Sequence, residues 1–117
     1  MRLSLLDAII VAVYIAAIVS IEPGACPDAK GDLTPYLRVP IMILWGDYVD
    51  TSTRWSPRLK GCREFTQAAN KLGGKVTHYV LPEHGIAGNS HMLMQDKNNI
   101  QIAEMLADWI GKNTVLK

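Results

Sequence analysis

The chain has 117 residues, of which 49% are hydrophobic and 20% charged, and its formal net charge is +1. These proportions are typical of a globular protein and exclude a disordered chain. Because so small a net charge creates no extended field, nucleic acid is not an expected partner. The length is sufficient for one compact domain with its own core.

The first feature in chain order is an apolar stretch at residues 3–21, in which Asp7 is the only charged residue. Three interpretations of residues 1–16 stay open: a buried helix leading into a strand, an export signal or membrane anchor, and a displaced start. Secreted, periplasmic and cytoplasmic locations are all compatible with them. We therefore divide the chain into an apolar segment of uncertain origin, 1–16, and a domain, 17–117, with membrane contact open to residues 1–20.

The next stretch alternates apolar runs with turns. Residues 17–21 predict a short buried strand, which ends at the turn Glu22-Pro23-Gly24. The proline- and glycine-containing residues 24–38 predict a loop. Residues 39–45 form a continuous hydrophobic run with proline only near its start, which is the pattern of a central parallel strand. Asp47 then lies just beyond the carboxyl end of that strand.

A helix and a third strand follow. Ser56 is expected to cap the helix, with Pro57 at its first position, where the missing N–H costs nothing. Gly73-Gly74 is expected to end it, and residues 76–81 form the next strand. The apolar residues at helical spacing are Cys62, Phe65, Ala69 and Leu72.

The last expected element is an amphipathic helix that begins after Asn98-Asn99. Its apolar stripe comprises Ile102, Ala103, Leu106, Trp109 and Ile110. Because a strand–helix–strand series makes a right-handed unit, the strands end at one edge of the sheet. Glu22, Asp47 and the loop at residues 82–91 are therefore expected to converge there.

Cys26 and Cys62 permit one disulfide. Whether they pair depends on the compartment, because an oxidising space favours a bridge and the cytosol favours buried thiols. A structural zinc site needs four ligands, whereas the histidines are scattered along the chain. They are His78, His84 and His91. We expect neither a metal nor a cofactor.

Four strings occur in one order along the chain. They are IVSIEPG at residues 18–24, VPIMILWGD at 39–47, RWSPRLK at 54–60 and GNSHMLMQDKNN at 88–99. Together they resemble a family of atypical bacterial α/β-hydrolase esterases, over about residues 17–113. The resemblance implies an α/β fold that corresponds to the C-terminal part of an α/β-hydrolase, with about three parallel strands, flanking helices and an incomplete sheet.

The resemblance also implies the site residues. His91 corresponds to the histidine of the catalytic triad, and Glu22 to an acid that follows the sixth strand of the family's sheet. Asp47 is the reserve acid, since most α/β-hydrolases carry theirs after the seventh strand. The nucleophilic serine of the fold lies in a Gly-x-Ser-x-Gly turn, and this chain contains no such turn. A complete α/β-hydrolase also needs about twice this length, because both faces of its sheet must be covered.

Two functions follow as hypotheses. The first is the C-terminal segment of a carboxylic-ester hydrolase of the Ser-His-Glu type, inactive alone and acting on a small-molecule ester when completed by the missing part. The second is a small non-catalytic binding or membrane-associated protein derived from a hydrolase. Self-association is expected in both cases, because the strand at residues 17–21 has lost a neighbour.

Several side chains near these motifs have simpler interpretations. Ser90 lacks a nucleophile turn and is expected to form hydrogen bonds within its loop, which Glu83 and His84 help to shape. The remaining large side chains are expected either to line an acyl pocket or to belong to the core. They are Trp55, Met92 and Met94.

Overall fold

Three parallel strands form the sheet, in the order β1-β2-β3. The computed structural model describes residues 17–114, so the expectations for residues 1–16 lie outside the described part. The strands are β1 (Ile18–Ile21), β2 (Ile41–Trp45) and β3 (Val76–Val80), each within two residues of its expected limits. Within residues 17–114, no helix is long and apolar enough to cross a membrane.

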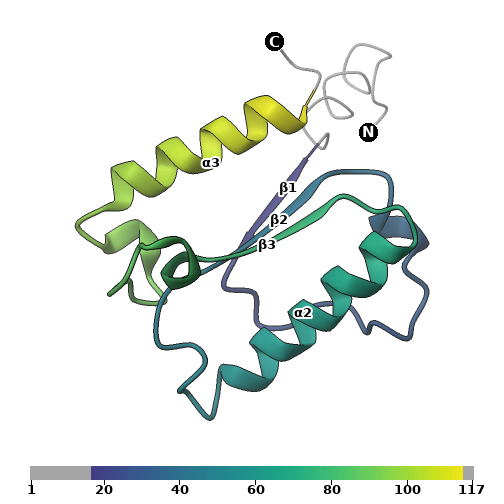
Figure 1. Ribbon diagram of the computed structural model, residues 1–117, viewed down its shortest axis with the longest axis horizontal. Coiled ribbons are helices and arrows are strands. Elements are labelled where there is room, and N and C mark those ends of the chain that lie inside the picture. Colours follow the sequence, from purple (N-terminus) through teal and green to yellow (C-terminus); the bar gives the residue numbers. More distant parts are fainter. Residues whose placement is uncertain (1–16, 115–117) are drawn as a thin grey trace, which may run out of the picture.

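One helix covers each face of the sheet (Figure 1). They are α2 (Ser56–Lys71) and α3 (Asn99–Asn113), and short 3-10 turns occupy Thr34–Tyr36, Leu81–His84 and Leu93–Gln95. The predicted α/β architecture with an incomplete sheet is confirmed. The β2–α2–β3 unit directs the carboxyl ends of all three strands toward the same edge.

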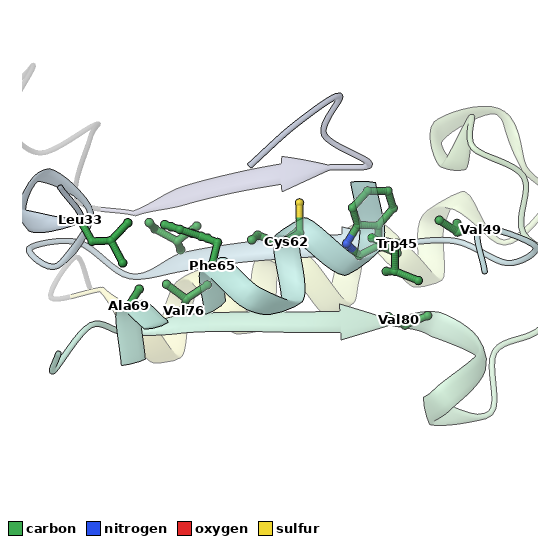
Figure 2. Close-up of a cluster of buried hydrophobic side chains, with 11 residues drawn as sticks. Leu33, Trp45, Val49, Cys62, Phe65, Ala69, Val76 and Val80 are labelled. Atoms are coloured by element: carbon green, nitrogen blue, oxygen red, sulfur yellow. The ribbon is translucent and has the colours of Figure 1, made fainter. Parts of the chain in front are cut away.

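The central strand β2 is buried along its whole length and separates two core clusters. Ile43 and Trp45 pack toward α2, whereas Leu44 belongs to the cluster on the α3 side. This alternation follows from the two-residue period of a strand. It explains the continuous hydrophobic run, since both faces of β2 are covered. Figure 2 shows Cys62, Phe65 and other members of the α2-side cluster.

Helix α2 begins and ends near the predicted residues, but its N-cap residue is not the predicted one. Ser56 lies inside the first turn and Trp55 is the N-cap residue, without a side-chain capping bond, so the prediction that Ser56 caps the helix is wrong. The Trp55 N–H instead donates to Ser52 Oγ at 3.3 Å. At the other end, Gly73 has a φ of 92°, as expected for the glycine after a helix. Leu72 is 62% exposed because it lies beyond the last helical turn.

The apolar stripe of α3 is narrower than predicted. Ile102 is buried and Met105 packs beside it, whereas Ala103 and Ile110 are exposed. Each helical residue turns about 100°, so Met105, Leu106 and Trp109 lie within about 60° of Ile102 while Ala103 and Ile110 lie about 80–100° away. The prediction that all five residues share the buried stripe is therefore wrong for those two.

Cys26 and Cys62 form a disulfide between residues that are 36 positions apart in the sequence. Of the two alternatives, a bridge or buried thiols, the structure has the bridge. The bridge ties the loop after Glu22 to α2.

Loss of this disulfide is expected to lower the free energy of unfolding by about 4 kcal/mol, because the bridge restricts a loop of this length in the unfolded chain. Urea unfolding with and without dithiothreitol measures the change. The double variant Cys26→Ser, Cys62→Ala is the control and should unfold at one midpoint under both conditions. Equal midpoints for the oxidised and reduced native chain would contradict the prediction.

Candidate active site

The carboxyl ends of the strands and the loop after β3 enclose a cavity of about 320 Å³. Glu22 comes from the end of β1, Asp47 from the end of β2 and His91 from the loop that follows β3. The predicted convergence of these residues at one edge of the sheet is confirmed. The other residues that line the cavity are Tyr48, Val49, Ser52, Trp55 and Ser90.

Glu22 is held in a strained and buried position. Its backbone φ is 45° and its residual exposure is 9%. Side-chain atom Oε1 accepts a hydrogen bond from the Gly46 N–H at 2.8 Å, whereas Oε2 is buried with no hydrogen-bond partner within residues 17–114. A non-glycine residue at positive φ and an unpaired buried oxygen are both costly, and such features concentrate at functional sites.

The environment of Glu22 also alters its ionisation. Burial raises the pKa of Glu22 above its usual value of 4.5, because the charged form loses water. The Gly46 N–H and the charge of His91 act in the opposite direction and lower the pKa of Glu22, while the charge of Asp96 raises it. His91 is thus close enough for its charge to affect the ionisation of Glu22.

Gly46 permits this close arrangement, and its role could not be predicted from the sequence. A Cβ atom at residue 46 would lie 2.7 Å from the Ser90 carbonyl oxygen and 3.0 Å from Glu22 Oε1. Any larger residue would push the histidine loop away from the end of β2. The sequence indicates the role of Gly46 only by placing a glycine between a buried strand and an acidic residue.

Asp47 connects the end of β2 to the histidine loop. Its Oδ1 accepts from the Tyr48 N–H at 2.7 Å and its Oδ2 from the Gly88 N–H at 2.7 Å. Its own N–H donates to the Asn89 carbonyl oxygen at 3.0 Å. Both carboxylate oxygens of the reserve acid therefore already accept backbone hydrogen bonds.

His91 is exposed at the mouth of the cavity. Its ring stacks on Trp55, with 6.2 Å between centroids and 27° between planes. The Arg58 guanidinium lies 4.8 Å from the centroid of the same indole. Trp55 thus contacts the histidine from the N-cap position of α2, and the expectation that it lines a pocket is confirmed.

The other residues singled out in the sequence have local roles or none. Ser90 forms loop hydrogen bonds, as expected, through Oγ to Asp96 Oδ1 at 2.8 Å. Glu83 pairs with Arg63, and His84 stacks on Tyr79 with 3.7 Å between centroids. The two methionines are exposed and do not line the cavity, so both the pocket and the core interpretations are wrong for them. They are Met92, 46% exposed, and Met94, 73% exposed.

Two known proteins are similar to this chain, one in sequence and one in sequence and fold. No family model matches the chain. Over 42 residues it is 53% identical to the probable secreted lipase phiG of Fungal sp. (strain ATCC 74256), a match that covers 36% of this chain and 12% of the lipase.

A solved structure gives a longer match. The chain superposes on the atomic-resolution structure of a novel bacterial esterase with a TM-score of 0.82 and 48% sequence identity, covering 86% of this chain. It spans about a third, 31%, of the esterase chain. In sequence and fold, the chain is therefore similar to part of a bacterial esterase, in agreement with the resemblance of its four sequence strings.

Proposed function

We propose that this chain supplies the histidine and the acid of a carboxylic-ester hydrolase of the Ser-His-Glu type. The observation that carries the proposal is the second carboxylate oxygen of Glu22, which is buried and has no partner within residues 17–114. A carboxylate oxygen in this state needs a donor, and the charge of His91 already acts on Glu22.

The proposed mechanism assigns one role to each group. His91 takes the proton of a serine hydroxyl as the serine attacks the ester carbonyl, and later returns it to the leaving alcohol. Glu22 Oε2 accepts the other imidazole N–H, which fixes the histidine tautomer and stabilises the imidazolium. The Gly46 N–H holds Oε1 and so orients the free oxygen.

Glu22 is a better candidate for the acid than Asp47. Both oxygens of Asp47 accept backbone hydrogen bonds of 2.7 Å, which suits a connector between loops. Glu22 has one oxygen bound and one without a partner, which suits an acceptor for histidine. The positive φ of Glu22 agrees with a functional role, because strained backbone clusters at active sites, and Tyr48 in the same cavity lining also has a positive φ of 64°.

The proposed substrate class is a small carboxylic ester. The names of the two similar proteins, an esterase and a probable secreted lipase, support ester chemistry. The cavity beside His91 has an indole and a phenol in its lining, from Trp55 and Tyr48, and these rings offer apolar surface to an ester. The nucleophile and its adjacent oxyanion donors come from a segment that this chain does not contain.

The chain by itself is expected to show no measurable esterase activity. Without the nucleophile, an acyl-transfer site retains at most an acceleration on the order of 10³ over water, and that remainder depends on oxyanion donors and substrate binding. Hydrolysis of p-nitrophenyl acetate by the repurified chain measures it. Turnover that survives repurification and disappears in His91→Ala would contradict the expectation of inactivity.

A chimera tests the assigned roles. Residues 17–117 would replace the matching part of the bacterial esterase with which the chain shares 48% identity. We expect the chimera to hydrolyse p-nitrophenyl acetate and His91→Ala to abolish that activity. An active chimera that keeps its full rate in His91→Ala would refute the proposed function.

A further inference from the structure

A network of side chains surrounds the residues that precede His91. Asn89 is 3% exposed, and its amide nitrogen donates to Asp96 Oδ2 at 2.9 Å and to Asn98 Oδ1 at 2.7 Å. Asn98 returns a hydrogen bond to Asn89 Oδ1 at 2.9 Å. The two amides are therefore paired reciprocally beneath the loop, next to the carboxylate of Asp96.

Asp96 accepts more of these bonds than any other member of the network. Besides the Asn89 amide, its Oδ2 accepts the Ser90 backbone N–H at 2.9 Å, and its Oδ1 accepts the Ser90 hydroxyl at 2.8 Å. The Ser90 hydroxyl oxygen in turn accepts the Met92 N–H at 3.0 Å. The backbone on both sides of His91 thus depends on one carboxylate.

We propose that Asp96 is a positioning residue for His91, which fixes the loop so that the imidazole faces the unpaired oxygen of Glu22. The inference rests on the proposed function, because it assumes that His91 works with Glu22. Within residues 17–114 no hydrogen bond joins Asp96 to Glu22 or His91, and the charge of Asp96 raises the pKa of Glu22. Asp96 acts through Asn89 and Ser90, which are the two residues immediately before the histidine.

The donors around this position favour a carboxylate. All three groups that Asp96 binds are donors, and an ionised carboxyl group only accepts. These hydrogen bonds, first from Asn89 and then from Ser90, hold the pKa of Asp96 below its usual value of 3.8, so the group is charged at neutral pH. An asparagine would remove the charge, and its NH₂ group would fit beside the Ser90 hydroxyl only if that hydroxyl turned its proton away.

The test uses the full chain and the variant Asp96→Asn, with Asp108→Asn as the matched control. Asp108 is an exposed aspartate on α3 that pairs with Lys112, so the control makes the same chemical change away from the loop. Hydrogen exchange of the Ser90 amide should accelerate about tenfold or more in Asp96→Asn, because its hydrogen bond to a charged group is weakened or lost. The Met92 amide should also exchange faster, because it is bonded to the Ser90 hydroxyl that Asp96 holds. Exchange in β2 should not change, and Asp108→Asn should resemble the native chain.

A second measurement reports on the histidine directly. In the native chain, Glu22→Gln should shift the imidazole NMR signals of His91, because the two groups are close enough to interact electrostatically. The same substitution should have little effect on those signals once Asp96→Asn is present. An unchanged response, together with unchanged exchange of the Ser90 and Met92 amides, would overturn the positioning role.

If Asp96→Asn also accelerates exchange in β2, the substitution has disturbed more than the loop. The milder variant Ser90→Ala then tests the positioning role. It removes one donor to Asp96 and the acceptor of the Met92 N–H, and it leaves the buried Asn89–Asn98 pair in place. Loss of protection at Met92 with a weakened response of His91 to Glu22→Gln would support the proposal. Unchanged protection of the Met92 amide, together with an unchanged response of His91 to Glu22→Gln, would overturn the proposal.

The chimera adds a kinetic readout. Asp96→Asn should lower kcat about 10²-fold and leave KM nearly unchanged, since a misplaced base slows the chemical step but not substrate binding. Full activity of Asp96→Asn would overturn the positioning role alone. Full activity of His91→Ala would refute the proposed function instead, so the two failures are distinguishable.

Discussion

In the esterase chimera, Glu22→Gln is expected to lower kcat by about 10⁴-fold, whereas Asp47→Asn should cost much less. A carboxylate that accepts the histidine N–H sets the tautomer of the base, and an amide in its place favours the wrong one. The Gly46 N–H would still bind the amide oxygen of glutamine, so the side chain keeps its position while an NH₂ donor replaces the acceptor Oε2. Steady-state hydrolysis of p-nitrophenyl acetate by the two variants measures the ranking.

A stability measurement separates this catalytic effect from misfolding. Because the pKa of Glu22 is raised in the folded state, ionisation of Glu22 opposes folding increasingly as the pH rises from 4.5 to that raised value. Glutamine carries no charge to bury. The Glu22→Gln chain should therefore be at least as heat-stable as the native chain at pH 7, and its advantage should vanish below pH 4.5.

The reverse ranking of activities would identify Asp47 as the acid. In that case Asp47→Asn would abolish turnover in a chain that still folds, and Glu22→Gln would remain active. The residue after β2 would then act as the acid does in most α/β-hydrolases.

The central strand was predictable because burial on both faces imposes an uninterrupted apolar run, whereas β1 is only partly buried, so its predicted burial is wrong. In β2, no polar residue interrupts Ile41–Trp45. Helix capping was less predictable, because Ser56-Pro57 has the composition of a cap and a first turn, yet the chain already turns at Ser52 and Trp55. The exposure of Leu72 was equally hard to predict, because it depends on where the last helical turn ends.

The candidate site was predictable only in part. Family resemblance pointed to Glu22 and His91, and strand topology correctly brought them to one cavity. The supporting residues were missed because their roles depend on contacts between loops. Gly46 matters because the Ser90 carbonyl approaches it, and Asp96 matters because the chain folds back onto Asn89. Neither contact leaves a periodic pattern in the sequence.

The chain on its own is expected to form dimers, larger assemblies or membrane-bound species. β1 pairs with β2 on one side, and no strand within residues 17–114 pairs with the other side. Ile18 on this strand is 44% exposed, and an apolar cavity of about 150 Å³ lies between β1, β2 and α2. An open strand edge beside apolar surface is a template for another chain.

Sedimentation and light scattering, with and without lipid vesicles, measure this association. Ile18→Lys should reduce it, because a charged residue on an edge strand opposes strand pairing. The matched control is Ile100→Lys, which changes an isoleucine that is 67% exposed on α3 and should leave the association unchanged. A monodisperse monomer of 12.9 kDa that unfolds cooperatively would contradict the prediction, and would mean that the open edge is protected within the chain itself.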